Sequence, residues 1–269
     1  MLNRSSLRTA TIITAGFCTG GPISTVVGQD AAKPTEEKKP LWETSANAGV
    51  TLTRGNSENF LATAGINTQR KWSRDEILAG ASAAYGTTEV EEPNPTPPPA
   101  TRDVDNRTEA YIKGFFQYNH LFTQRFYGAI RADGLNDEIA DVHYRFSLSP
   151  LAGYYFIKSP NTTLSGDIGP SWVVEKVGNA GPRGYLGIRA GERFEHKFKS
   201  GARVWQTADI TPEVENWENY VLNAEVGVEA PLTKKLAARL VLQDTYDHQP
   251  SPGREKNDLK LIAGLAYKF

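Results

Sequence analysis

The stretch Tyr220–Ala230, which reads YVLNAEVGVEA, alternates between apolar and polar side chains. One set comprises Leu222, Ala224, Val226, Val228 and Ala230, and the other comprises Asn223, Glu225, Gly227 and Glu229. A period of two residues is that of a β-strand, because successive side chains point to opposite faces of a sheet. The following run, 235–247, repeats the pattern, so the two runs predict a β-hairpin with one apolar and one polar face.

Similar runs fill the chain from Trp42 to its end. We count about twelve, at 42–54, 58–72, 75–87, 105–120, 124–134, 141–157, 162–175, 184–198, 201–214, 218–231, 235–247 and 257–269. Many exceed the strands of soluble sandwiches, whereas a tilted membrane strand needs about 9–11 residues. A soluble fold would also need a second apolar layer to cover every apolar face, and no helical segment is evident to supply one. A closed barrel in lipid needs no such layer and has no unpaired edge. The sequence therefore predicts an all-β fold, a transmembrane antiparallel up-and-down β-barrel of about 12 strands.

The lengths of the connections between the runs support a membrane barrel and indicate its orientation. Every second connection is tight, at 73–75, 121–123, 158–161, 199–201 and 231–235. The intervening ones are mostly longer, at 88–104, 135–140, 176–183, 215–217 and 248–256. Bacterial outer-membrane barrels have short periplasmic turns and longer outer loops. We therefore expect an even strand number, with both chain ends on the periplasmic rim.

The N-terminus has the three regions of a secretory signal. Arg4 and Arg8 precede an uncharged, largely apolar segment, 9–27, and small residues follow up to Gly28. We expect 1–28 to be a cleaved signal peptide, 29–41 a disordered periplasmic leader, and 42–269 an outer-membrane β-barrel. A membrane anchor and a lipoprotein signal at Cys18 are the alternatives. Cys18 is the single cysteine, so the remaining chain has no disulfide framework.

The composition limits the classes of partner. The 269 residues carry a formal net charge of −1, which indicates no bulk attraction to nucleic acid. Only 39% are hydrophobic and the mean hydropathy is −0.46. Outside the N-terminus no stretch of about 18 apolar residues occurs, which excludes a helical membrane protein. A barrel remains compatible, because only alternate residues of each strand face lipid. The expected partners are outer-membrane lipid and small solutes.

In such a barrel the polar faces line the interior. Both signs of charge occur there in similar numbers, and buried charges must pair to be tolerated. We therefore expect an ion-pair network across the barrel, leaving either a narrow polar channel or none. The candidate lumenal charges are Glu109, Lys113, Arg131, Asp133, Arg145, Asp167, Arg189, Arg193, Glu195, Glu225, Glu229 and Arg239.

The opening of the chain after Trp42 resembles a known family. Trp42-Glu43, Gly49 and the run Leu52-Thr53-Arg54-Gly55-Asn56-Ser57-Glu58 resemble the start of the domain of unknown function 481 family, whose members are known as YdiY-like or salt-induced outer-membrane proteins. Aromatic-glycine segments such as Gly114-Phe115-Phe116 and Leu151-Ala152-Gly153-Tyr154-Tyr155 extend the resemblance to Phe269, with a Pro-rich insertion at 91–100 as the main departure. The resemblance implies an outer-membrane barrel and supplies no catalytic residues.

The chain ends on an alternating aromatic pattern. Leu265, Tyr267 and Phe269 share one predicted face, and Phe269 is the last residue. This resembles the C-terminal signal recognised by the barrel assembly machinery, which is therefore an expected partner during insertion.

The sequence offers no catalytic constellation, cofactor motif or metal motif. The histidines lack metal spacing, and His143 and Ser147 are expected to face the lumen as part of a polar network. Asp137, Glu138 and Asp141 cluster in one predicted loop, where a cation or plain solvation are the alternatives. Two function classes stay open. One is a narrow passive pore or an envelope component made under salt or osmotic stress, and the other is a membrane-embedded hydrolase acting on lipid or lipopolysaccharide. A soluble periplasmic β protein is a minor third possibility.

Overall fold

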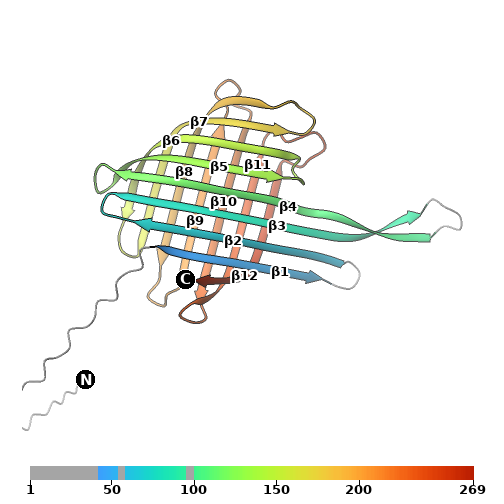
Figure 1. Ribbon diagram of the computed structural model, residues 1–269, viewed down its shortest axis with the longest axis horizontal. Helices are drawn as coiled ribbons and strands as arrows, with labels where there is room; N and C mark the ends of the chain where they lie inside the picture. Colours follow the sequence, from blue (N-terminus) through green and yellow to red (C-terminus); the bar gives the residue numbers. More distant parts are fainter. Residues whose placement is uncertain (1–41, 54–57, 95–99) are drawn as a thin grey trace, which may run out of the picture. The chain divides into compact units, whose positions relative to one another are not determined.

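The computed structural model describes residues 42–53, 58–94 and 100–269, so the predicted signal peptide and leader lie outside it. The described chain forms twelve antiparallel strands that close into a barrel (Figure 1). The strands are β1 (Glu43–Thr53), β2 (Glu58–Lys71), β3 (Asp75–Asn94), β4 (Ala100–Leu121), β5 (Phe126–Asp137), β6 (Val142–Lys158), β7 (Thr162–Val177), β8 (Arg183–Lys197), β9 (Arg203–Pro212), β10 (Tyr220–Pro231), β11 (Leu236–Asp247) and β12 (Asn257–Lys268). This confirms the predicted all-β transmembrane barrel. Among the described residues, no helix is long and apolar enough to cross a membrane.

Each strand pairs with its neighbours in the chain, and β12 returns to β1. The connections at 72–74, 122–125, 159–161, 198–202 and 232–235, together with the C-terminus, form one end of the barrel, here called the turn end. The connections at 138–141, 178–182, 213–219 and 248–256 lie at the opposite end, here called the loop end. Each strand pairs with the next strand along the chain in a regular register. The period-two pattern alone was therefore sufficient to locate the strands.

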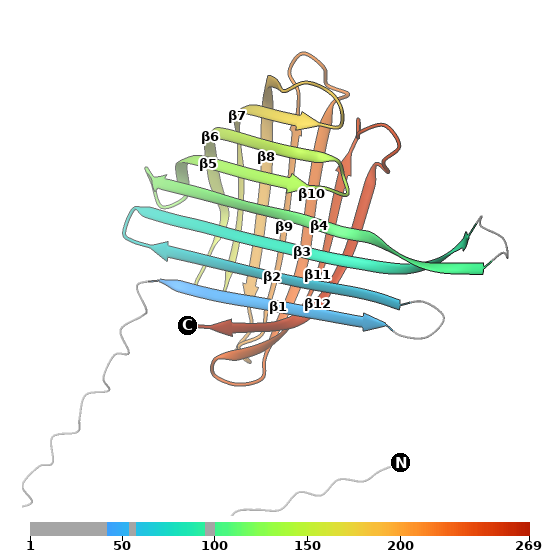
Figure 2. The ribbon, with the colours of Figure 1, turned by 45° about the vertical axis from the view of Figure 1, so that its right-hand side comes forward.

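One predicted loop is wrong. The segment 88–104 was expected to be a long connection, but β3 and β4 continue through it as a paired hairpin up to Asn94 and Ala100. The hairpin projects well beyond the neighbouring strands (Figures 1 and 2). The register shifts between Gly86 and Thr87, which marks a β-bulge where the hairpin leaves the barrel wall.

The two faces of the strands differ in exposure. On β10, Val226 and Val228 are 52% and 41% exposed, whereas Glu229 between the chain neighbours Val228 and Ala230 is 1% exposed. Apolar side chains thus point outward and polar ones inward, which is the inverse of a soluble protein and the arrangement of a membrane barrel.

Glycines on the inner face make room for large aromatic rings. Gly153 of β6 lies opposite Tyr127 of β5, and a Cβ at Gly153 would overlap the tyrosine ring. Gly227 of β10 stands in the same relation to Trp205 of β9. Tyr127 also packs in an apolar cluster with Leu121, Ala129, Leu151 and Tyr155 near the turn end. Side chains therefore fill part of the interior, as expected for a small barrel.

Candidate functional site

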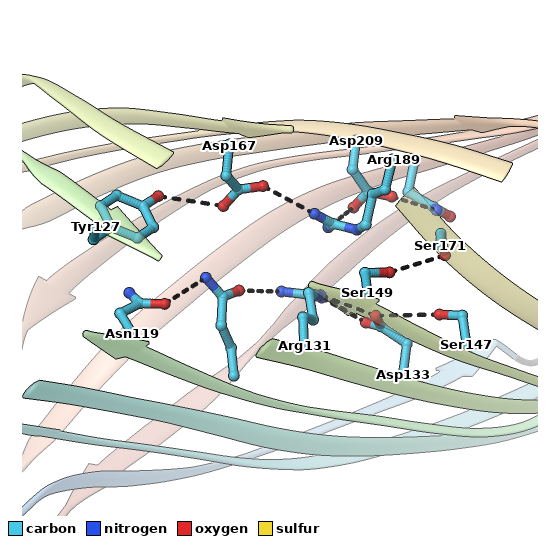
Figure 3. A network of polar contacts seen from close by, with 12 residues as sticks. Asn119, Tyr127, Arg131, Asp133, Ser147, Ser149, Asp167, Ser171, Arg189 and Asp209 are labelled. Carbon is cyan, nitrogen blue, oxygen red and sulfur yellow. Dashed lines mark hydrogen bonds and ion pairs between the residues drawn. The ribbon is translucent and has the colours of Figure 1, made fainter. Parts of the chain in front are cut away.

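The candidate site is the lumen, whose middle is held by a polar network on β4 to β7. Arg131 of β5 donates from Nη1 to Oε1 of Gln117 at 3.1 Å and from Nη2 to Oδ1 of Asp133 at 2.6 Å (Figure 3). Gln117 donates onward to Asn119 at 2.9 Å. These charge-assisted and amide hydrogen bonds fix Arg131 against its own wall of the barrel, so its charge is neutralised locally.

A second group joins β5, β7, β8 and β9. Arg189 places one guanidinium nitrogen 3.2 Å from Asp167 and another 3.1 Å from Asp209 (Figure 3). The hydroxyl of Tyr127 donates to the other oxygen of Asp167 at 3.3 Å. Arg189 is thus held between two carboxylates, which is the arrangement that makes a buried charge tolerable.

At the loop end, Glu175 of β7 binds two arginines. Arg145 donates from Nε to Oε2 of Glu175 at 2.6 Å, and Arg183 lies 2.7 Å from Oε1. Arg183 also reaches Glu213 at 3.2 Å. A polar cavity of about 390 Å³ opens beside these groups, bordered further by the loops at 178–180 and 249–252.

At the turn end, Glu229 of β10 holds two cations. Its oxygens lie 3.1 Å from Arg203 and 2.8 Å from Lys268. Glu195 of β8 lies 3.4 Å from Lys197 and 3.8 Å from Arg193. Basic groups outnumber acidic ones among these lumenal side chains.

Ion pairs also join walls that are not adjacent. Lys260 of β12 lies 2.9 Å from Glu109 of β4, and Arg145 of β6 lies 3.3 Å from Asp247 of β11. Tyr155 of β6 donates to Glu76 of β3 at 2.5 Å. Because β12 and β4, and β6 and β11, are far apart in the closed strand order, these contacts cross the lumen. These three contacts narrow the lumen at different positions along the barrel axis.

Lys113 and Arg239 are two of the lumenal cations that face aromatic rings. Nζ of Lys113 lies 5.3 Å from the centre of the Tyr111 ring, and the guanidinium of Arg239 lies 4.7 Å from that of Trp205. Among the described residues, neither has an ion-pair partner. Their charges are partly stabilised by the ring faces and stay available to the lumen.

The charges on the wall β8 to β12 are sorted along the barrel axis. The half nearer the turn end carries Arg193, Lys197, Arg203, Arg239 and Lys268 against Glu195 and Glu229. The half nearer the loop end carries Asp209, Glu213, Glu225, Asp247 and Asp258 against Arg183, Arg189 and Lys260. The charge of this wall is therefore near balance overall, but the wall is mainly basic at the turn end and mainly acidic at the loop end.

All twelve charges proposed for the network lie on the inner face, and six of them form pairs within the set: Arg131 with Asp133, Arg189 with Asp167, and Arg193 with Glu195. Glu109, Arg145 and Glu229 instead pair with residues that the sequence argument did not single out, namely Lys260, Glu175, Asp247, Arg203 and Lys268. Glu225 accepts hydrogen bonds from Trp205 and Gln243 at 2.6 and 2.7 Å. The alternation that identified the twelve candidates also places these partners on the inner face.

The histidines lie at the barrel ends. His143 is exposed at the loop end, 3.8 Å from Asp141, whereas Ser147 faces the lumen and donates to Asp133 at 3.5 Å. The expectation that both face the lumen thus fails for His143, because the register shift between Val142 and Tyr144 displaces it. At the turn end, His120 lies on the outer face, 2.8 Å from Asp75.

The acidic loop cluster is engaged by the protein itself. Asp137 accepts the backbone N–H groups of Ile139 and Ala140 at 3.0 and 2.9 Å, and Glu138 pairs with Arg107. Asp141 accepts from Ser251 at 3.1 Å. Over the described ranges, no group of three or more His, Cys, Asp or Glu is placed to hold a metal ion.

The predicted assembly residues share the outer face of β12. Leu265 and Tyr267 are 49% and 41% exposed, and the ring of Phe269 lies 5.2 Å from that of Tyr267. The N–H of Phe269 donates to Thr44 of β1 at 3.1 Å. The last residue therefore lies at the closure of the barrel, on the turn end.

Solved outer-membrane barrels share this architecture. The NanC porin has 7% identity, covers 84% of this chain and 100% of that chain, and gives a TM-score of 0.50. The translocator domain of the autotransporter NalP from Neisseria meningitidis has 14% identity, with 85% and 87% of the two chains covered and a TM-score of 0.40. At 7% identity the likeness to the porin shows the fold alone, which is that of an outer-membrane β-barrel.

The family follows from the sequence match. The model of DUF481, described as a protein of unknown function, matches residues 46–269, and the chain belongs to this family. This confirms the resemblance found in the segment after Trp42. No curated protein matches the sequence.

Proposed function

We propose that the protein is an outer-membrane pore for small polar solutes, narrowed by ion pairs that cross its lumen, with the turn end facing the periplasm. The observation that carries the proposal is the bridge between Lys260 of β12 and Glu109 of β4, 2.9 Å apart, inside a lumen lined by polar groups of both signs. The family and the porin-like fold are compatible with this role.

The chemistry of the lining favours water and small polar solutes. Charged and amide side chains at every level can replace part of a solute's hydration shell, as in other selective pores. Because the wall β8 to β12 is mainly basic towards the turn end and mainly acidic towards the loop end, the lumen offers no continuous track of one sign for a multiply charged ion. Small neutral or zwitterionic solutes fit such a lining best.

The bridges set the width and are adjustable. Lys260 and Glu109 remain 22% and 19% exposed, so solvent reaches the pair and screens it. A lysine side chain has several rotatable bonds, and a small displacement would open the contact without disturbing the strand ladder.

Planar-bilayer recording of the refolded full barrel tests the proposal. Small, discrete conductance steps support the pore, and a barrel that inserts but stays silent over a range of salt would overturn it in favour of a structural role. The production under salt or osmotic stress that the sequence resemblance implies stays a prediction, which immunoblots of cells grown at low and high osmolarity would check.

A further inference from the structure

The pairing between the first and last strands ends early. β1 and β12 pair from Ser45–Lys268 to Ala48–Leu265, and no further pair between them is present in the described part of the chain. By contrast, β1 stays paired with β2 up to Thr53, and β12 stays paired with β11 back to Asn257. Figure 2 shows β12 lying along the first half of β1 and then rising away with β11. Towards the loop end, β1 and β12 therefore each have one unpaired edge.

Two glycines mark the point where the strands separate. A Cβ at Gly49 would lie 2.6 Å from the carbonyl oxygen of Ala263, and one at Gly264 would overlap that of Ala48. The backbones thus cross at closest approach here, which glycine alone allows. Beyond the crossing, 49–53 of β1 and 257–264 of β12 form what we call the seam.

The seam joins two apolar surfaces. On the outside, Val50, Leu259 and Leu261 are 64%, 63% and 65% exposed. On the inside, Leu61 and Ile262 line a small pocket at the crossing together with Thr63 and Gly49. Ile262 is backed by the buried Val241, its register partner on β11. Apolar side chains therefore lie on both the lipid-facing and the lumenal side of the seam at this level.

A cation lies directly inside the seam. Lys260 follows Leu259 and precedes Leu261, but points inward, with Nζ 4.7 Å from the centre of the Tyr111 ring and 2.9 Å from Glu109. Unpaired backbone groups in hydrocarbon are costly, so an edge of this kind is stable only when something occupies it or when it lines a polar space. A lipid with an anionic headgroup matches the seam, because its acyl chain suits the apolar surfaces and its headgroup suits Lys260.

We propose that the seam is a lateral binding site for one acyl chain of an anionic lipid, which enters from the bilayer between β1 and β12 and brings its headgroup towards Lys260. The site requires the barrel to be embedded in a bilayer but does not require the lumen to conduct. A silent barrel that still takes up lipid at the seam would separate the two proposals.

Site-specific photo-crosslinking tests the site in the full barrel. Benzoylphenylalanine is placed at Ile262, inside the seam, and the protein is reconstituted in vesicles of equal dioleoylphosphatidylglycerol and dioleoylphosphatidylcholine. Leu261 on the outer face serves as the positive control, and Thr207, on the lumenal face of β9, as the negative one. We expect lipid adducts by mass spectrometry at Ile262 and Leu261 and none at Thr207. Adducts at Leu261 without any at Ile262 would overturn the proposal.

Closing the seam provides the second arm. A Cys18→Ser background receives two further substitutions, Val50→Cys and Ala263→Cys. These two positions would form the next outward-facing pair if the register of Ala48–Leu265 continued along the strands. Oxidation, or a short bis-maleimide where the strands are too far apart, should reduce adducts at Ile262 to background and leave those at Leu261 unchanged. The pair Ala48→Cys and Leu265→Cys, already in register, is the matched control and should leave both unchanged. Labelling at Ile262 that survives closure would contradict lateral entry.

The headgroup assignment is tested with Lys260→Gln. We expect phosphatidylglycerol to exceed phosphatidylcholine several-fold among the Ile262 adducts of the wild type, and the two to be equal in the variant. Equal labelling by both lipids in the wild type would remove the anionic headgroup from the proposal.

Discussion

Lys260, in the first third of the last strand, lies 2.9 Å from Glu109 on the fourth strand, with the lumen between their backbones. The contact brings together residues that are distant in sequence and are not on neighbouring strands. Closure of the barrel places their strands on facing walls, and two side chains long enough to meet then bridge the space. The interior is thus organised by contacts across the lumen as well as by the strand ladder.

The space left by Gly153 for the Tyr127 ring should be required for stability. A Gly153→Ala variant places a methyl group into that ring, so we expect the free energy of unfolding to fall by about 1–3 kcal/mol. Urea unfolding of the barrel in vesicles measures it. Gly134→Ala on β5 is the control, because nothing lies within 4 Å of its added Cβ. Equal stability of the two variants would show that Tyr127 can move aside.

We expect the native Glu192 to lower the free energy of unfolding of the barrel. It lies on the outer face of β8 between Gly166 and Ala208, where its carboxylate accepts a hydrogen bond from Gln206 at 2.7 Å. An acidic group on a lipid-facing surface is unfavourable, so Glu192→Leu should raise the free energy of unfolding by about 1 kcal/mol. Gln206→Leu, which removes the donor and leaves the acid, should lower it. A destabilised Glu192→Leu variant would indicate that this face is not in contact with lipid.

Arg239 should influence ion selectivity. Its guanidinium faces Trp205 and forms no ion pair among the described residues, so its charge acts on the passage. Arg239→Gln should shift the permeability ratio of K⁺ to Cl⁻ towards K⁺ by roughly two-fold. Reversal potentials under a KCl gradient give the ratio. Arg131→Gln, which removes a cation already neutralised by Asp133, should change it less. An unchanged ratio for Arg239→Gln would argue that ions pass elsewhere.

Phe269 should serve assembly more than stability. Phe269 is 71% exposed, and its ring lies 5.2 Å from that of Tyr267. Phe269→Asp should reduce heat-modifiable barrel in outer membranes several-fold, while the purified variant refolds in detergent like the wild type. Parallel losses in cells and in detergent would assign Phe269 a structural role instead.

The strands could be predicted closely because each has one lipid-facing and one lumenal face. The run expected at 162–175 became Thr162–Val177, and that expected at 235–247 became Leu236–Asp247. The hairpin beyond Gly86 was missed because its proline-rich sequence is typical of a loop. The alternation also assigns Lys260 to the lumen, but it cannot show that Glu109 is its partner. That depends on which walls closure brings within reach of each other.

Other features depart from the alternation of apolar and polar residues and are visible only in the three-dimensional structure. Glu192 is a charged residue at a lipid-facing position, and periodicity gives no reason to look for its partner Gln206. The early end of pairing at Ala48–Leu265 also has no sequence signal stronger than two glycines, since Gly49 and Gly264 resemble many others in the barrel.

Single-channel conductance of a Glu109→Ala/Lys260→Ala double variant tests the central claim most directly. Removing both side chains avoids an unpaired buried charge and removes the cross-lumen contact between β4 and β12. Compared with the wild type at equal salt, the account predicts a conductance larger by roughly half or more, with the same folded mobility on gels. Small steps of unchanged size in the double variant would contradict the claim that this bridge sets the width of the pore.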